Sequence, residues 1–404
     1  MLPYIIDWLS LLGRWVHLIT GIAWIGSSFY FVWLDNHLQP PKSEEDAGKG
    51  VGGEIWSVHG GGLYHAQKYR TPPAVMPATL HWFKWEAYTT WLTGMFMLCL
   101  IYWYGAEIYL VNSAVSDLTP LQAVGAAISF IVGGWIVYDL MCKSPLGRNE
   151  TALAGGLFVL VVFLAWALCQ LFSGRGAYIH FGAVLGTIMV ANVFFVIIPG
   201  QKQMVAAAER GETPDPIHGI RGKQRSVHNT YFTLPVLFVM VSNHYAMTYS
   251  HEYNWLVLVG LSLAGALIRV FFVARHTAAA RGGRTSPTAL IIAGLILAVI
   301  AAAIAPQTTK PVSKIETETT ISSADLQVIM TARCTTCHAQ TPTYAAYTTP
   351  PAGVMLETIA QIEQNAARIH EQTVVTKVMP IGNLTKMTDA ERADITQWYQ
   401  ALQP

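Results

Sequence analysis

The stretch ALAGGLFVLVVFLAWALCQLF, residues 152–172, decides the fold class. It holds no charged residue, and at 1.5 Å per residue it is long enough to cross the roughly 30 Å hydrocarbon core of a bilayer as a helix. A lone strand would leave backbone N–H and C=O groups unbonded in hydrocarbon, whereas a helix bonds them within the segment. The stretch therefore predicts a transmembrane helix.

Similar apolar stretches recur along the chain, and together they predict eight transmembrane helices. Their approximate ranges are 8–34, 86–104, 120–141, 152–172, 178–198, 228–246, 254–273 and 287–305. Thr119 and Ser286 each precede a proline, and a capping hydroxyl before proline is a typical helix start. Only 12% of the residues are charged, about half the fraction usual in soluble domains. We predict an all-α fold with an eight-helix transmembrane bundle over residues 1–306.

Basic residues are concentrated in alternate loops, which predicts the orientation of the bundle. Arg175 is the exception on the other side. The loops after the first, third, fifth and seventh predicted helices contain Lys42, Lys49, Lys68, Arg70, Lys84, Lys143, Arg148, Lys202, Arg210, Arg221, Lys223, Arg225, Arg275, Arg281 and Arg284. Because cytoplasmic loops are enriched in Lys and Arg, both termini are predicted to face the outside. The net charge of +1 and the lack of a basic, aromatic-interleaved patch argue against a nucleic-acid partner.

After Pro306 the composition changes abruptly. The segment QTTKPVSKIETETTISSAD is polar and rich in Thr, which predicts a linker over residues 307–324. The remaining residues, 325–404, are predicted to form a small soluble domain.

This domain contains Cys334-Thr335-Thr336-Cys337-His338, which is the Cys-x-x-Cys-His signature of covalent c-type haem attachment. The two thiols bind the porphyrin vinyl groups and the histidine binds the iron. A redox dithiol and a zinc knuckle are the alternatives, but the chain has no second Cys pair and no βαβ pattern. The motif predicts a class I-like cytochrome c domain on the periplasmic side of a bacterial inner membrane, because bacteria attach haem c outside the cytoplasm.

Met379 is the predicted sixth iron ligand. It precedes Pro380 in an irregular stretch, and a Met/His ligand pair raises the reduction potential of haem iron. The rival ligands are Met355, His370 and Met387. Thr388 and Glu391 form a capping-box pattern, which predicts the start of a terminal helix. One face of this helix contains Ile395, Trp398 and Leu402, and we predict that it packs on the haem-attachment helix.

Histidines within the predicted bundle suggest one or two b-type haems. Helical spacing places His17 on one face with Gly13 and Gly21, which would admit a flat porphyrin or, equally, close helix packing. His180 and His244 fall near the same outer end, and His81 and His228 near the inner end. Asp139 and Arg269 lie within predicted helices, where ionisable groups are generally functional, or they pair with each other. The loop WSVHGGGLYHAQKY, residues 56–69, is either a solvated loop or a structured re-entrant one.

Four long segments carry a family resemblance. RWVHLITGIAWIGSSFYFVWLD (14–35), LHWFKWEAYTTWLTG (80–94), GTIMVANVFFVIIPGQ (186–201) and HNTYFTLPVLFVMVSNHY (228–245), followed by the haem-c motif, resemble the bacterial membrane-bound urate oxidase (urate hydroxylase) family with a C-terminal cytochrome c domain. More loosely, the first helix is similar to haem-binding membrane proteins of the protoporphyrinogen-oxidase type, which favours His17 as a haem ligand.

The resemblance implies oxidation of urate to 5-hydroxyisourate. Electrons would pass through haem to the cytochrome c domain and the respiratory chain, by way of a periplasmic cytochrome c or a terminal oxidase, without release of peroxide. Urate is anionic near neutral pH, so its site needs a cation, for which Arg14, Lys84 and Arg269 are candidates. The catalytic candidates are His81, Glu86 and Arg269.

Two other classes of function stay open. A non-catalytic electron-transfer subunit would relay electrons from a quinol or a partner dehydrogenase to a soluble cytochrome, and it would need no anion site. A transporter or sensor with a redox tail is least supported, because only Pro235 indicates the broken helix that a transporter would need.

We expect the purified protein to keep part of its haem after extraction with acidified acetone. Haem c is covalently bound and stays with the polypeptide, whereas haem b leaves. Absorbance spectra recorded before and after extraction measure both fractions. A colourless protein, or one that loses all of its haem, would contradict the assignment of the motif.

Overall fold

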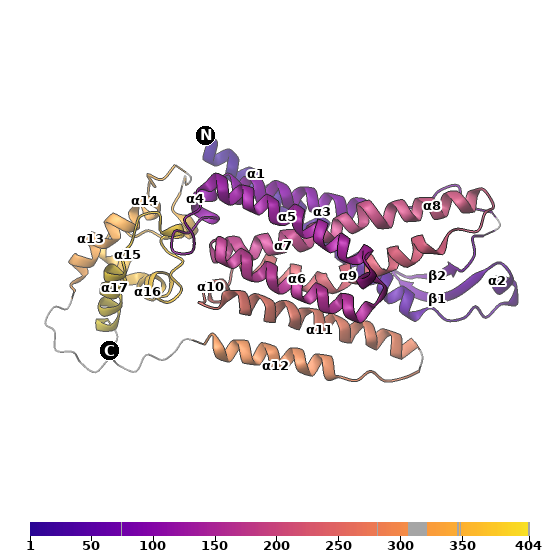
Figure 1. Cartoon of the computed structure of the whole chain (residues 1–404). Coiled ribbons are helices and arrows are strands. Elements are labelled where there is room, and N and C mark those ends of the chain that lie inside the picture. Colours follow the sequence, from indigo (N-terminus) through magenta and orange to yellow (C-terminus); the bar gives the residue numbers. More distant parts are fainter. Residues whose placement is uncertain (74, 281, 306–320, 346, 348, 403–404) are drawn as a thin grey trace.

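The computed structural model describes residues 1–73, 75–280, 282–305, 321–345, 347 and 349–402. Long helices form an elongated bundle, and a small helical domain caps one end of it (Figure 1). The bundle elements are α1 (Leu2–His37), α3 (Trp85–Met97) with η1 (Leu98–Trp103), α4 (Ala106–Tyr109), α5 (Pro120–Lys143), η2 (Pro145–Arg148), α6 (Glu150–Leu171), α7 (Gly174–Ala191) with η3 (Asn192–Ile197) and α8 (Ile198–Glu209), α9 (Pro216–Ser242), α10 (Ala246–Tyr249), α11 (Asn254–Ala280) and α12 (Thr288–Ala303).

Five helices in the described part of the chain are long and apolar enough to cross a membrane. They are Tyr4–His37, Pro120–Lys143, Glu150–Leu171, Gly174–Glu209 and Asn254–Ala278. The chain is therefore a multi-pass membrane protein. A helix occupies most of each of the eight predicted stretches, although α9 ends at Ser242, four residues short of the predicted end. Helix α12 has only 16 residues, and α3 has only 13 before the backbone widens into η1. Eight passes remain a prediction.

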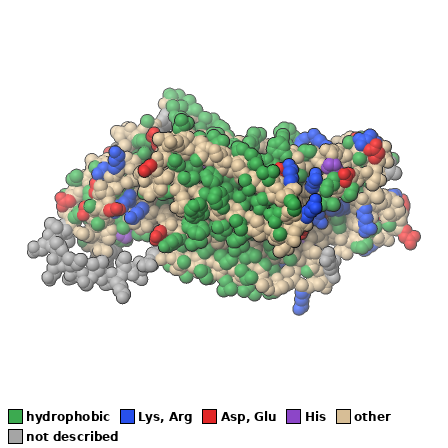
Figure 2. Space-filling view, in the orientation of Figure 1, with side chains coloured by type: hydrophobic (Ala, Val, Ile, Leu, Met, Phe, Trp, Pro, Cys, Tyr) green, Lys and Arg blue, Asp and Glu red, His purple; other side chains and the backbone are tan. Residues whose placement is uncertain are grey.

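Hydrophobic side chains cover the middle of the visible face, whereas charged side chains gather towards its two ends (Figure 2). Such a band is the surface that a bilayer would cover. The N-terminus and the C-terminal domain lie at the same end of the bundle, and the loop between α8 and α9 lies at the other (Figure 1). The side of the membrane that each end faces remains the prediction made from the loop charges.

The two predicted helix starts had different outcomes. Thr119 caps α5 through a complete capping box with Gln122, as predicted. At the second start the helix begins one residue later than predicted, because Pro287 occupies the N-cap position and α12 begins at Thr288. The Ser286 hydroxyl accepts from the backbone N–H of Thr288 at 3.4 Å and also bonds the Thr288 hydroxyl at 2.6 Å.

The chain is not purely α-helical, because the loop after α1 folds into a hairpin. After the short helix α2 (Glu44–Gly48), strand β1 (Val51–His59) pairs antiparallel with β2 (Gly62–Tyr69) at the end of the bundle away from the C-terminal domain (Figure 1). Gly60 and Gly61 form the two-residue turn, with φ of 57° and 80°. Two glycines with positive φ are typical of the turn that matches strand twist, so the glycine run was a hairpin signal that the loop interpretation missed.

Helix α7 runs through the core of the bundle, and small residues bring its neighbours close. A Cβ atom added to Gly134 of α5 would lie 2.5 Å from Cγ1 of Val184 on α7, and one added to Gly182 of α7 would lie 2.7 Å from Cγ1 of Val239 on α9. Membrane helices use small residues in this way to gain van der Waals contact.

The C-terminal domain has its own apolar cluster, which includes Leu326, Met330, Ile362, Ile395 and Trp398. Its elements are α13 (Ser323–Arg333), α14 (Thr335–His338), η4 (Pro351–Gly353), α15 (Ile359–Gln364), α16 (Ala366–His370), η5 (Glu371–Val375), η6 (Ile381–Asn383) and α17 (Asp389–Ala401). Residues 307–320 of the predicted linker lie outside the described residues, and α13 begins at Ser323, two residues before the predicted boundary.

The terminal helix largely follows its prediction. Thr388 and Glu391 form the capping box, and α17 packs on α13. Ile395 and Trp398 are buried as predicted, but Leu402 is 43% exposed because the helix ends at Ala401.

We expect Gly134→Ala to lower the melting temperature in detergent relative to Gly133→Ala. The new methyl group of Gly134→Ala must displace Val184, at a cost of about 1–3 kcal/mol, whereas a Cβ at Gly133 meets nothing within 4 Å. Both variants gain the same helix propensity, so the difference isolates the contact between α5 and α7. Equal melting temperatures would contradict this packing.

Candidate functional site

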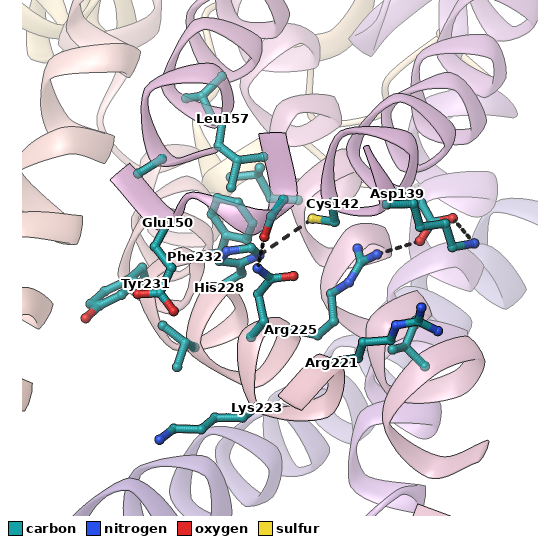
Figure 3. A pocket seen from close by; sticks show the side chains of 18 of the residues that line it. Asp139, Cys142, Glu150, Leu157, Arg221, Lys223, Arg225, His228, Tyr231 and Phe232 are labelled. Atoms are coloured by element: carbon teal, nitrogen blue, oxygen red, sulfur yellow. Dashed lines mark hydrogen bonds and ion pairs between the residues drawn. The ribbon is translucent and has the colours of Figure 1, made fainter. Parts of the chain in front are cut away.

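A cavity of about 1870 Å³ opens among α5, α6, α8, α9 and α11 (Figure 3). Its lining includes the start of α9, which lies at the end of the bundle away from the C-terminal domain (Figure 1). Its charged lining is predominantly basic, with two carboxylates against five cations. The carboxylates are Asp139 and Glu150, and the cations are Lys143, Arg148, Arg221, Lys223 and Arg225. A cavity lined by an excess of one charge concentrates ligands of the opposite sign, so this one favours anions.

A polar network borders the cavity where α5, η3 and α9 meet. The hydroxyl of Tyr138 lies 2.7 Å from Nδ1 of His228, and it accepts a hydrogen bond from the amide nitrogen of Asn192 at 3.0 Å. Which of these two atoms donates depends on the tautomer of His228, because a hydroxyl oxygen can accept two bonds as well as donate one. In either tautomer the contact joins α5 to α9.

Asp139 pairs with Arg225 and not with Arg269, the alternative partner considered from the sequence. Its carboxylate accepts from Arg225 at 2.7 Å and from Lys143 at 2.6 Å (Figure 3). The Arg225 guanidinium also lies over the ring of Tyr138, 4.9 Å from its centroid. The sequence interpretation put Arg225 in a loop because it missed Asp215, which caps α9 one residue before Pro216. Asp followed by Pro is a helix-start signal, and α9 therefore begins before Arg225.

Arg269 is a buried cation without a hydrogen-bonding partner at two of its nitrogens. The residue is 6% exposed, and neither Nε nor Nη2 has a partner in the described part of the chain. Its guanidinium carbon lies 3.8 Å from the ring centroid of Phe29 on α1. Arg269 is not among the residues that line the cavity, but Ala266, Leu267 and Val270 of the same helix, α11, are.

Buried polar atoms without a partner among the described residues also occur on Ser250, Ser262 and Glu86. Glu86, in the first turn of α3, is half-buried, and its Oε2 is the atom without a partner. The ring of Phe83, three residues earlier, contacts Phe31 of α1 at 4.8 Å. Since Phe29 is two residues from Phe31, Glu86 and the Phe29–Arg269 contact lie near the same level of the bundle.

The other predicted substrate and catalytic residues lie at more open positions. Arg14 is exposed and donates to Ser10 at 3.2 Å, and His81 is exposed beside Phe83. Lys84 occupies the N-cap of α3, 5.9 Å from the ring centroid of Trp85. The structure therefore singles out Arg269 and Glu86 from the predicted set.

His17 is held between α1 and α3. Its Nδ1 lies 2.9 Å from the carbonyl oxygen of Thr90 and 3.1 Å from the hydroxyl of Thr93, and its ring lies against Gly94. With the proton on Nδ1 donated to the carbonyl, Nε2 is the nitrogen left to bind a metal, as in most metal-binding histidines. The neighbouring Gly13 and Gly21 face Phe96 and Thr90 of α3, so these small residues serve helix packing.

The remaining predicted haem histidines differ in their surroundings. His180 is fully buried; its Nδ1 lies 2.7 Å from the carbonyl oxygen of Gly176, and its Nε2 accepts from the indole of Trp103 at 3.1 Å. Both ring nitrogens of His180 are thus engaged within the protein. His244 is exposed after the end of α9.

The attachment motif in the C-terminal domain has the donor set that haem c requires. Cys334 and Cys337 are free thiols, and burial raises the pKa of Cys334 to about 12. Nδ1 of His338 lies 3.0 Å from the carbonyl oxygen of Val354, a bond that orients the ring and leaves Nε2 for iron. These residues fit a covalently bound haem.

The predicted sixth ligand, Met379, is half-buried in a loop, and both its backbone N–H and its backbone carbonyl are hydrogen-bonded. Its amide donates to Gln372, and its carbonyl accepts from Arg392 at 3.0 Å. Among the rivals, Met387 is buried in the apolar cluster and His370 stacks on Tyr399 with centroids 4.4 Å apart. Met355 is half-buried.

The apolar helices, the cationic cavity and the buried unpaired guanidinium define a multi-pass membrane protein with a site suited to an anionic small molecule. The chain belongs to the urate oxidase N-terminal family, whose model matches residues 3–305. Membership suggests an oxidoreductase with urate as its substrate. No curated protein and no solved structure matches the chain.

We expect Asp139→Asn to destabilise the protein strongly. The substitution leaves Arg225 buried and without its counter-charge, and breaking a buried ion pair in this way costs about 3–5 kcal/mol. The matched control is Lys68→Met, which removes the exposed Lys68–Asp35 pair and should cost less than about 1 kcal/mol. Thermal unfolding in detergent measures both variants. An equal, small loss for both would refute the structural role of the Asp139–Arg225 pair.

Proposed function

We propose that this protein oxidises urate to 5-hydroxyisourate in its membrane domain and passes the electrons to a haem c on its C-terminal domain. Family membership supports the substrate and the reaction class. The structural observation that supports the site is the unpaired, buried guanidinium of Arg269.

A buried cation without a partner is costly, so Arg269 favours an anionic ligand. The desolvation penalty of a buried ion is several kcal/mol unless an opposite charge or hydrogen bonds offset it. Nε and Nη2, the two unpartnered nitrogens, lie on one edge of the guanidinium and present parallel N–H groups. This edge suits bidentate binding to a flat anion, and urate is a flat anion.

Glu86 supplies complementary chemistry. Urate carries ring N–H groups beside its carbonyl oxygens, and a carboxylate oxygen accepts from such an N–H. Oxidation of urate to 5-hydroxyisourate takes up one water and releases two protons and two electrons. A carboxylate near the substrate can accept one of these protons, and we assign this role to Glu86.

The cationic cavity is the proposed entry route. Its excess of basic residues would attract urate from solution, and Ala266, Leu267 and Val270, on the same helix as Arg269, line its wall. His228 also lines this cavity, beside the Tyr138 hydroxyl.

In the C-terminal domain, Cys334 and Cys337 hold the haem c covalently, and His338 and Met379 bind its iron. When bound, haem supplies a one-electron acceptor, so each urate requires two successive transfers or a second haem in the bundle. His17 is the bundle histidine whose surroundings best fit a haem b ligand, because Nδ1 is anchored and Nε2 is not. A periplasmic cytochrome c or a terminal oxidase is the proposed final acceptor.

Purified protein mixed with urate in the absence of oxygen should develop the absorbance of reduced haem c without any partner. Arg269→Gln should raise the KM for urate by about 10- to 100-fold, because each hydrogen bond to a charged group contributes about 1.5–3 kcal/mol. Arg284→Gln, which alters an exposed loop arginine, is the control and should leave KM unchanged.

The melting temperature of Arg269→Gln shows whether this variant still folds. Because Arg269→Gln removes an unpaired buried charge, it should raise the melting temperature measured without urate. If urate fails to reduce the wild-type haem, the protein is an electron-transfer subunit and not an enzyme. If Arg269→Gln keeps a normal KM, Arg269 does not bind the substrate.

A further inference from the structure

The C-terminal domain contacts the bundle at α4, the short helix that follows η1 (Figure 1). The contacting element is η6, which begins two residues after Met379. A Cβ atom added to Gly382 would lie 3.0 Å from the carbonyl oxygen of Glu107 and 3.5 Å from that of Ile108. Gly382 has a φ of 59°, so glycine suits both the backbone conformation and the close approach.

A second contact joins two tyrosines across the same interface. The hydroxyl oxygens of Tyr109, on α4, and Tyr347, in the C-terminal domain, lie 3.4 Å apart. Val378, next to Met379, packs against the apolar core of the bundle. Two separate segments of the C-terminal domain therefore rest on the bundle.

Tyr347 belongs to a loop that is bonded directly to the haem-attachment turn. The backbone amides of Thr343 and Tyr344 both donate to the carbonyl oxygen of Thr336, at 3.1 and 3.0 Å, and Thr336 lies between Cys334 and Cys337. The ring of Tyr344 lies 6.0 Å from that of Tyr347. The tyrosine contact is thus linked to the turn that carries both thiols.

On the bundle side, aromatic rings continue inward from the interface. The ring of Tyr109 lies 5.9 Å from that of Tyr102, which in turn lies 5.9 Å from the imidazole of His180. Asn243 anchors this row by accepting from the hydroxyl of Tyr102 at 3.3 Å and from Arg175 at 3.1 Å. The Arg175 guanidinium lies 5.4 Å from the ring centroid of Tyr109.

We propose that α4 is an intramolecular docking surface for the C-terminal domain, and that the row Tyr102, Tyr109 and Tyr347 is the electron route across it. The docking stands on the contacts alone, whereas the electron route rests on the proposed function. Each crossing would carry one electron, taken from urate by the haem b proposed for the bundle, to the haem c proposed for the C-terminal domain, so each urate requires two crossings. The electron tunnels through the packed atoms, and no tyrosine is itself oxidised.

The docking is tested in the full-length chain, with a photo-crosslinking amino acid in place of Tyr347 and a specific protease site inserted between residues 307 and 320. After irradiation and cleavage, we expect the two fragments to remain covalently joined, with the crosslink mapping to residues 106–111. The same amino acid in place of Tyr399, on α17 of the same domain, is the control and should give no joined product. The absence of a crosslink from position 347, or one that maps elsewhere on the bundle, would overturn the docking surface.

The electron route is tested by stopped-flow absorbance. Tyr109→Ala should slow the reduction of haem c by urate by about tenfold or more, while direct reduction by ascorbate keeps its wild-type rate. Tyr104→Ala, which removes an exposed tyrosine at the same end of the bundle, should leave both rates unchanged. An unaltered urate-driven rate in Tyr109→Ala would overturn the route. Failure of urate to reduce the wild-type protein would instead refute the proposed function and leave the crosslinking result to decide the docking.

Discussion

The structure depends on one constraint, which is that backbone N–H and C=O groups in hydrocarbon must find their partners inside the protein. Helices meet this constraint within each segment, so the apolar stretches can only become helices. The β-hairpin Val51–Tyr69 lies instead at an end of the bundle, beyond the central hydrophobic band of the surface (Figures 1 and 2). The same constraint applies to side chains, because a polar group buried in the bundle is stable only with a partner.

The polar side chains of this bundle differ in whether all of their atoms have hydrogen-bond or ion-pair partners. Asp139 and Arg225 neutralise each other, and both ring nitrogens of His180 are hydrogen-bonded, so these groups hold helices together. Arg269, Glu86, Ser250 and Ser262 instead have buried polar atoms without a partner among the described residues. Buried polar groups are nearly always paired in proteins, and in the proposed function the substrate pairs the two charged ones, Arg269 and Glu86.

In the proposed function, the C-terminal domain receives the electrons that the substrate releases. The apolar cluster of this domain is separate from that of the bundle. The domain nevertheless contacts α4 through Gly382 and through the hydroxyl contact between Tyr347 and Tyr109. A tether alone would allow many orientations and only a millimolar effective concentration. A docked domain keeps the haem-attachment turn in one place, which suits repeated one-electron transfers.

The sequence by itself determined the helical bundle, the haem-attachment motif and the capping boxes at Thr119 and Thr388, because hydropathy and short-range hydrogen bonds depend on neighbouring residues. It also placed Arg269 and Glu86 among its candidates for the substrate site, since a charge within or at the end of an apolar stretch is visible without coordinates. It put the start of α12 one residue too early and Leu402 on the packed face of α17, because the exact end of a helix decides which groups bond or pack. Only the tertiary structure decided the partner of Asp139, the Tyr138–His228 contact and the docking on α4, because these contacts join residues from 86 to more than 200 positions apart in the chain and depend on how whole helices pack.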